Sequence, residues 1–249
     1  MGLRFSSHVL ARIGAAPLLV SVARLRCWQK SDSSCTHLAM TIGCFVASGG
    51  NITISKVKGL VAAAEELHEE LSGGIITPLE ASQHYPDAHH IGTFEAPVVP
   101  PPELPLCAGG GGAVLSASGM ADAVDQGLRQ LASDRGFLAL TGHAHTTLLL
   151  PRECGSDGHC RKAVFVNLVG SMLQPTGKAG GSKEGYAICI EGATPTAFKH
   201  NLGSVLQWQF CDRYAATGFP DQNSREALCN GQLFQVDVFR MGETQLPGF

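Results

Sequence analysis

The chain has few of the features that mark membrane-spanning, nucleic-acid-binding or disordered proteins. Its formal net charge is −3, and no run of Lys and Arg is long enough to follow a phosphate backbone, so nucleic acid is not an expected partner. The apolar stretch 13–23 is short and interrupted by Pro17, which argues against a membrane span. With 44% hydrophobic and 16% charged residues, the composition is that of a globular chain of 249 residues.

Closely spaced cysteines of the kind that build a disulfide framework are also missing. The chain has 9 Cys, an odd number, so at least one thiol stays outside any pairing. This usage is consistent with a reducing compartment and with a thiol nucleophile.

Residues 1–27 have the composition of a targeting segment. They contain Arg and Ser but no acidic residue, which is typical of a mitochondrial or plastid transit peptide. Residues 13–23 equally fit the apolar core of a secretory signal, and an edge strand or helix over residues 18–22 is a further alternative. We expect any cleavage to fall before Trp28. The expected location is cytoplasmic or nuclear, or organellar if the segment is a transit peptide.

One cysteine follows a polar, turn-prone run and precedes an apolar helical pattern. Residues 28–34 read Trp-Gln-Lys-Ser-Asp-Ser-Ser, and apolar residues with helical spacing follow at Leu38 and Ile42. Cys35 is therefore predicted at a helix N-terminus, where unpaired N–H groups and the helix dipole favour a thiolate. Gln29 is predicted to donate its side-chain amide, beside the Cys35 N–H, to a developing oxyanion.

A histidine and an asparagine follow in the order that papain-like enzymes use. Residues 135–150 predict two strands that meet at a Gly-His corner, and residues 163–168 predict another strand. We predict Cys35 as the nucleophile, His143 as the base and Asn167 as the residue that orients the base. His145 is the alternative base.

At these residues the chain resembles the Josephin-domain deubiquitinases, over roughly residues 28 to 195. The shared pattern is a Gln before the catalytic Cys, an acidic second helix, a His-x-x-Thr strand, a strand carrying Asn, and a Gly-Tyr-x-Ile strand. The matching pieces are Gln29 and Cys35, residues 65–70, 143–146, 166–173 and 184–188. The chain departs from the pattern at Ala144, where the family has a bulky aromatic, and in an insertion at 151–162.

The MINDY deubiquitinases are similar in the Gln and Cys arrangement and in the His-x-x-Thr strand. Either resemblance implies an α+β, papain-like cysteine protease fold. It also implies hydrolysis of the bond after the C-terminal glycine of ubiquitin or a ubiquitin-like protein, with no metal or organic cofactor. Two other classes stay open: a catalytically silent ubiquitin-binding module, and an accessory subunit of an organellar complex.

A zinc site competes with the catalytic interpretation of the histidines. Five potential ligands lie within 18 residues: His143, His145, Cys154, His159 and Cys160. Their spacing matches no standard zinc finger, so we favour a catalytic His followed by an irregular loop.

The rest of the chain is divided by its turn-forming residues. We expect a papain-like domain over residues 28–195 and a C-terminal extension over 196–249 that packs on it. The elements expected within them are a helix over 35–47, a helix from Ser55 to Leu71 with a solvated acidic run at 65–70, an irregular Pro- and Gly-rich arm over 73–113, a helix over 119–133 capped by Ser118, a helix through Val205 and Trp208, and a strand over 232–240.

Overall fold

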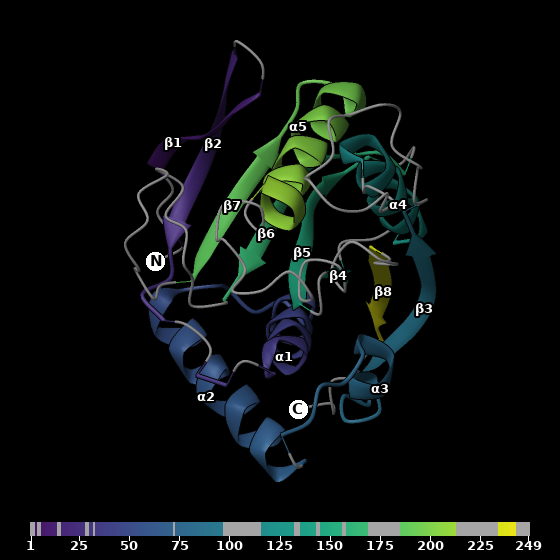
Figure 1. The fold of residues 1–249 in the computed structure, drawn as a ribbon. Coiled ribbons are helices and arrows are strands. Elements are labelled where there is room, and N and C mark those ends of the chain that lie inside the picture. Colours follow the sequence, from purple (N-terminus) through teal and green to yellow (C-terminus); the bar gives the residue numbers. More distant parts are fainter. Residues whose placement is uncertain are drawn as a thin grey trace, which may run out of the picture.

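A computed structural model describes residues 3, 6–13, 16–27, 30–31, 33–71, 73–96, 116–131, 135–142, 145–155, 158–168, 185–212 and 234–242. Within these residues, strands β1 to β8 form one antiparallel sheet with helices on both faces (Figure 1). The chain therefore has the mixed α+β architecture that the sequence predicts.

The sheet has the strand order β1-β2-β7-β6-β5-β4-β8-β3, and every neighbouring pair is antiparallel. Its strands are β1 (Ser6–Ile13), β2 (Ala16–Arg24), β3 (Ala88–Glu95), β4 (Gly136–Gly142), β5 (His145–Cys154), β6 (Cys160–Asn167), β7 (Tyr186–Glu191) and β8 (Gln235–Met241).

Helices cover the two faces in separate groups. One face carries α1 (Cys35–Ala47), α2 (Ile54–Glu70) and α3 (Pro78–Ser82). The other carries α4 (Ala117–Gln130), α5 (Pro195–Gln207) and the single π-helical turn η1 (Trp208–Asp212) that continues α5. Among the described residues, no helix has the length and apolar content needed to cross a bilayer.

The helices begin where short polar side chains can accept a hydrogen bond from the first turn. Thr53 caps α2, Ser116 caps α4 and Thr194 caps α5, each through its hydroxyl. Thr77 forms a capping box with Glu80 at α3. The helix expected over 119–133 therefore begins two residues earlier, at Ala117, with Ser116 as its cap in place of Ser118.

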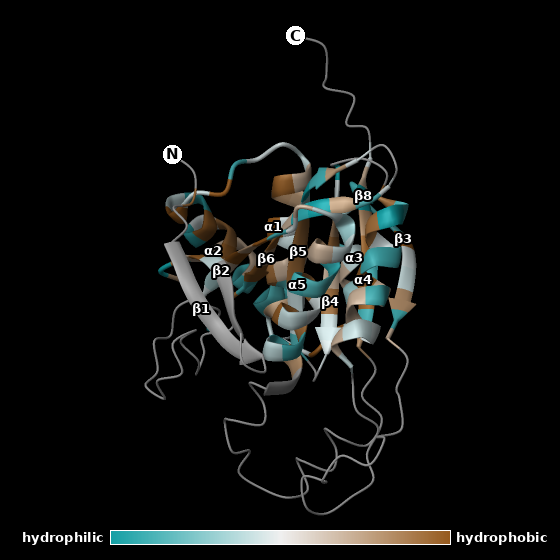
Figure 2. Ribbon diagram, turned by 90° about the horizontal axis from the view of Figure 1, so that it is seen from above, coloured by the Kyte–Doolittle hydropathy of each residue, from teal (hydrophilic) through white to brown (hydrophobic). Residues whose placement is uncertain are grey.

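The central strands are apolar at both odd and even positions because both faces of the sheet are covered. Phe137, Ala139, Leu148 and Val166 pack toward α1 and α2. The alternate residues of the same strands, such as Leu138, pack toward α4 and α5. Figure 2 shows this concentration of apolar residues on α1, β5 and β6, with more hydrophilic residues on α4 and β3.

The N-terminal segment is part of the sheet. β1 pairs with β2, and β2 pairs with β7 from Ser21 opposite Cys189 to Arg24 opposite Tyr186. Leu25 is fully buried in the core beneath α1. Residues 18–22 are therefore a strand, as one alternative expected, but they lie in the inner strand β2, and β1 forms the edge. Cleavage before Trp28 would remove both strands from the sheet.

One further expectation needs correction. Residues 73–96 are not an irregular arm, because they contain α3 and the strand β3; residues 97–115 lie outside the described residues.

The described part of the C-terminal extension packs on the rest of the chain. β8 lies between β4 and β3, and α5 packs into the same core as α4, so the C-terminal part completes the sheet.

Candidate active site

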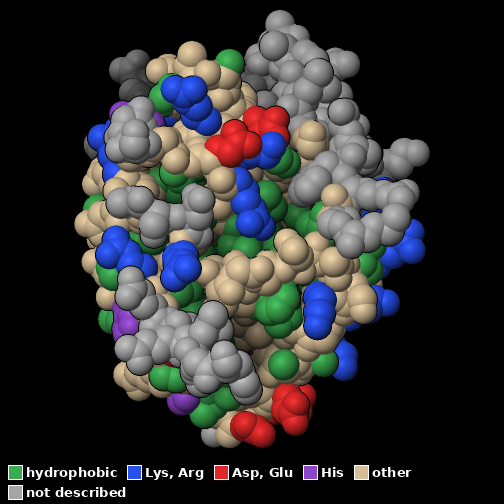
Figure 3. Space-filling model, turned by 180° about the vertical axis from the view of Figure 1, so that it is seen from behind, with side chains coloured by type: hydrophobic (Ala, Val, Ile, Leu, Met, Phe, Trp, Pro, Cys, Tyr) green, Lys and Arg blue, Asp and Glu red, His purple; other side chains and the backbone are tan. Residues whose placement is uncertain are grey.

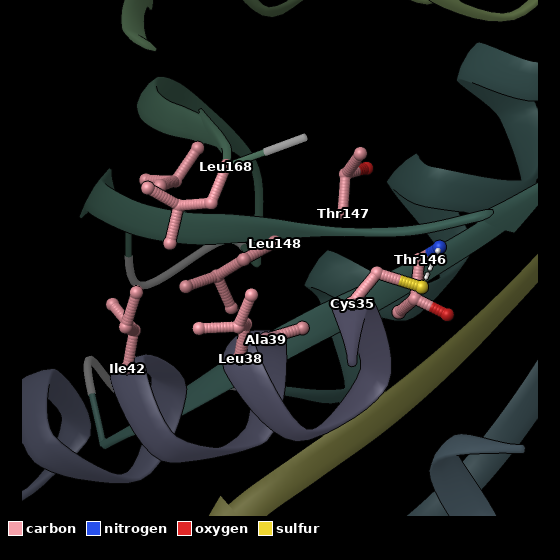
Figure 4. A pocket seen from close by; sticks show the side chains of 9 residues that line it. Cys35, Leu38, Ala39, Ile42, Thr146, Thr147, Leu148 and Leu168 are labelled. Atoms are coloured by element: carbon pink, nitrogen blue, oxygen red, sulfur yellow. Dashed lines mark hydrogen bonds between the residues drawn. The ribbon is translucent and has the colours of Figure 1, made fainter. Parts of the chain in front are cut away.

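Cys35 is the first residue of α1, as predicted, and its thiol lies against β5. The Thr146 N–H donates to Cys35 Sγ at 3.4 Å (Figure 4). The β5–β6 pairing ends at Leu148 opposite Val166, so Thr146 pairs with Thr141 of β4 but lies beyond the residues that pair with β6. The fold therefore joins the start of α1 to the beginning of β5, two segments that are 111 residues apart in the sequence.

A chain of hydroxyl groups holds the same junction. Thr36 Oγ1 donates to the Ile76 carbonyl at 2.9 Å, so it can only accept from Thr146 Oγ1, 3.0 Å away. Thr146 Oγ1 in turn accepts from Thr141 Oγ1 at 3.1 Å. These bonds connect β4, β5, α1 and the segment before α3, and fix the position of the Cys35 backbone.

The thiol of Cys35 is buried, with 7% of the residue exposed. Burial raises the pKa of Cys35, and the hydrogen bonds from Thr146 and Thr36 oppose this effect. A small pocket beside the thiol is lined by Leu38, Thr146, Leu148, Val166 and Leu168, among others. The cavity has a volume of about 10 Å³, which is space for one water.

Glu65 of α2 holds the loop that leads into Cys35. Its carboxylate is 5% exposed and accepts from the Lys30 N–H at 2.7 Å, the Ser34 hydroxyl at 2.8 Å and the Ser31 N–H at 3.3 Å. The expectation that residues 65–70 form a solvated acidic face is therefore wrong for Glu65. Its spacing from the buried Val61 and Ala64 is the signal that marks it as inward-facing.

Ser34 is the N-cap of α1, but its hydroxyl bonds Glu65 and the Ser31 carbonyl rather than the helix. The N-cap side chains of α2, α3, α4 and α5 accept a hydrogen bond from the helix that they begin, whereas that of Ser34 at α1 does not. The Ser34 hydroxyl therefore accepts no hydrogen bond from the backbone N–H groups in the first turn of α1, where Cys35 lies. Such N–H groups stabilise negative charge.

Histidines pack beside this loop on the α2 side. His68 Nε2 lies 2.9 Å from Ser33 Oγ and 3.3 Å from Ser31 Oγ. His37 lies in the first turn of α1. The centroid of its ring is 5.5 Å from that of His68 and 6.4 Å from that of His84. His37 is 1% exposed, and burial, followed by the neighbouring His68 and His84, lowers its pKa to about 4. His37 is therefore neutral at physiological pH.

Two of the predicted site residues, Gln29 and His143, lie outside the described residues. The alternative base His145 is described and is buried at the start of β5. Thr146 points toward α1, where it contacts Thr36, so its neighbour His145 points toward the opposite face of the sheet. The structure does not bring the His145 side chain to the α1 side, where Cys35 begins its helix.

Asn167 is also on the face opposite α1. Its side-chain amide donates to the Tyr186 hydroxyl at 3.1 Å, and that hydroxyl donates to Gln209 Oε1 at 2.5 Å. Tyr186 packs edge-on against Trp208, which follows α5. The neighbours Val166 and Leu168 point to the α1 side instead. The predicted role of Asn167, which requires a base shared with Cys35, is therefore not supported by its position.

His143 lies outside the described residues, and the potential zinc ligands that can be placed on β5 and β6 do not converge. His145 begins β5 and Cys154 ends it, which places them about 30 Å apart along an extended strand. Cys160 starts β6 opposite Cys154, so it lies at the same far end. Among the described residues, no group of three or more His, Cys, Asp or Glu has the arrangement of a metal site.

A second polar cluster, which the sequence did not indicate, joins β3 to β8. The fully buried Asp237 accepts from Thr93 Oγ1 at 2.7 Å and from Gln235 Nε2 at 2.8 Å, and lies 3.1 Å from His90 Nε2. The cluster satisfies a buried carboxylate and ties the edge strand to the sheet.

The surface on the back of the molecule mixes charges. Figure 3 shows Lys and Arg side chains scattered among apolar and acidic ones on this face. Lys162 of β6 forms an ion pair with Glu191 of β7, which raises the Lys162 pKa and lowers that of Glu191.

Comparison with known protein families and with curated protein sequences finds no match for this chain.

Proposed function

We propose that the chain is a thiol-dependent hydrolase of papain-like type, with Cys35 as nucleophile and His143 as base. The observation that carries the proposal is the contact between Cys35 Sγ and the Thr146 N–H. It places a cysteine at an uncapped helix N-terminus against the β4–β5 hairpin. His143 lies in the two-residue connection of that hairpin, three residues before Thr146.

In the proposed reaction, His143 withdraws the Cys35 proton, and the thiolate attacks a substrate carbonyl to form an acyl-enzyme that water hydrolyses. A base is needed because burial holds the pKa of Cys35 above its ordinary value. The Cys35 N–H and the Gln29 amide bind the oxyanion. No role is assigned to Asn167, because its side chain faces Tyr186 on the other side of the sheet.

The proposed substrate is ubiquitin or a ubiquitin-like protein, cleaved after its C-terminal glycine. The resemblance of residues 28–195 to the Josephin and MINDY deubiquitinases suggests this class. The pocket beside Cys35 is lined by Leu38, Ala39 and Leu148, so it favours an uncharged part of the substrate next to the sulfur.

A ubiquitin probe with a C-terminal electrophile tests the proposal. The wild-type protein should be labelled covalently at Cys35, and Cys35→Ala should abolish labelling and hydrolysis. Cys44→Ala is the matched control, because Cys44 lies in the same helix and burial raises its pKa to about 12. Labelling that persists in Cys35→Ala, or that maps to Cys44, would refute the assignment.

The two histidines can be compared in the same assay. His143→Ala should lower kcat by at least about a hundredfold, within the range typical of general acid–base catalysis. His145→Ala should lower kcat much less, because the His145 side chain points away from the α1 face of the sheet. Equal losses would contradict His143 as the base.

A catalytically silent ubiquitin-binding module is the second candidate. It is favoured by the burial of Cys35 and by the position of Asn167. Such a module would bind ubiquitin without covalent labelling. An accessory subunit of an organellar complex would neither bind nor be labelled, so one titration separates the three.

A further inference from the structure

Cys154 and Cys160 face each other across the far end of the β5–β6 hairpin. They are directly opposed partners in the antiparallel ladder, so their side chains project to the same face. Both pack on the core between the sheet and α4, and both are thiols in the structure. This end of β5 is remote from Cys35, which contacts Thr146 near the other end.

The backbone around the pair brings the two side chains close. The next pair outward is Gly155 and His159, and the Gly155 N–H donates to the His159 carbonyl at 2.8 Å. Hydrogen-bonded and non-hydrogen-bonded pairs alternate along an antiparallel ladder. Cys154 and Cys160 are therefore a non-hydrogen-bonded pair, in which Cα atoms are about 4.5 Å apart. This spacing lies inside the range of roughly 4.4–6.8 Å that a disulfide spans.

The two sulfur atoms already interact and differ in access. A hydrogen bond from the Cys154 side chain is the largest effect on Cys160 and lowers the Cys160 pKa. Cys160 Sγ also lies 3.0 Å from the Lys162 carbonyl, to which its S–H donates. Cys160 is 2% exposed, whereas Cys154 is half-buried. An external reagent therefore reaches Cys154 first, and Cys160 is held next to it.

We propose that Cys154 and Cys160 form a redox-active dithiol that a low-molecular-weight disulfide oxidises to a cross-strand disulfide. The Cys154 thiolate attacks one sulfur of the reagent, whose S–S bond breaks and releases one thiol. The Cys160 thiolate then attacks the Cys154 sulfur of the mixed disulfide and releases the second thiol. The protons of both cysteines end on the two released thiols, and one disulfide is exchanged for another. The new bond closes the 155–159 loop and fixes the register of the hairpin end.

The test uses the full chain with Cys35→Ala, so that the candidate nucleophile does not react. The protein is incubated with oxidised glutathione, the remaining thiols are alkylated, and the peptides are identified by mass spectrometry. We expect an internal link between Cys154 and Cys160, lost on treatment with reduced glutathione. Cys160→Ser should lose the link completely and retain glutathione on Cys154.

Two controls keep the result decisive. Cys189→Ser removes a buried thiol on the adjacent strand β7 and should leave the link intact. Circular dichroism melting of each variant before oxidation shows that it is folded, and Cys154→Ser provides a second disruption of the pair. The proposal is overturned if the parent accumulates glutathione on Cys154 without an internal bond, or if Cys154 links to a different cysteine.

Discussion

Removal of the Glu65 carboxylate should destabilise the fold and displace the loop before Cys35. Glu65→Ala leaves the Lys30 and Ser31 N–H groups without their acceptor and opens a cavity between α2 and the loop. A hydrogen bond to a charged group is worth roughly 1.5–3 kcal/mol, but water can reach the N–H groups of the exposed Lys30 and the half-buried Ser31, and only the Ser34 bond is buried. We therefore expect Glu65→Ala to lower the free energy of unfolding by about 3 kcal/mol.

Glu65→Gln should be milder, because the stronger contacts share one oxygen. Lys30 and Ser34 both donate to Oε1, which a glutamine retains, whereas Ser31 donates to Oε2 at the longer distance of 3.3 Å. The retained hydrogen bonds are then made to a neutral oxygen and are about half as strong. We therefore expect Glu65→Gln to lower the free energy of unfolding by about 2 kcal/mol.

Urea unfolding at pH 7, followed by circular dichroism, gives these free energies by linear extrapolation. Glu66→Gln is the matched control, since Glu66 is the next residue of α2 and is exposed; it should change stability by less than about 0.5 kcal/mol. Amide hydrogen exchange at Lys30 and Ser31 should accelerate in Glu65→Ala. If Glu65→Ala costs no more than Glu66→Gln, the inferred anchoring role of this carboxylate is wrong.

Three further predictions concern the buried residues His37, Gly43 and Asp237. As the pH falls from 6.5 toward 4, stability should decline by up to about 3 kcal/mol, because unfolded chains protonate His37 while the folded state, with a pKa of about 4, does not. His37→Leu should flatten this dependence in urea titrations, and an unchanged slope would contradict it. Gly43→Ala should lower the free energy of unfolding by about 1–3 kcal/mol, because the added Cβ would lie 2.5 Å from the Phe137 ring. Its control is Gly59→Ala, where the added Cβ meets open space; this variant should raise the free energy of unfolding by up to about 1 kcal/mol. Asp237→Ala should lower the free energy of unfolding by about 3 kcal/mol, because the Thr93 and Gln235 hydrogen bonds are lost. Asp122→Ala, at a half-buried residue of α4, should lower it by less than about 1 kcal/mol. Similar losses in the two variants would refute the role of the cluster.

Local signals in the sequence were sufficient to predict the elements that carry the site. The polar run before Cys35 and the helical spacing after it predicted a helix beginning at that residue, and α1 begins there. The Gly-His corner predicted a hairpin, and β4 and β5 form it. These features depend on residues a few positions apart, whose backbone preferences act without the rest of the chain.

Pairing between distant segments decided what the sequence left open. The insertion of β8 between β4 and β3, and of β2 beside β7, depends on hydrogen bonds to strands far away in the chain. No local pattern specifies such neighbours.

The sequence by itself therefore determined the α+β class, the helix at Cys35 and the hairpin at His143. Only the tertiary structure decided which way Asn167 and Glu65 point. Because both faces of the sheet are covered, β6 is apolar at odd and even positions alike, and alternation cannot tell which face Asn167 occupies. Glu65 is buried because the loop at 30–34 supplies donors to it, a compensation that exists only once α2 and that loop are packed together.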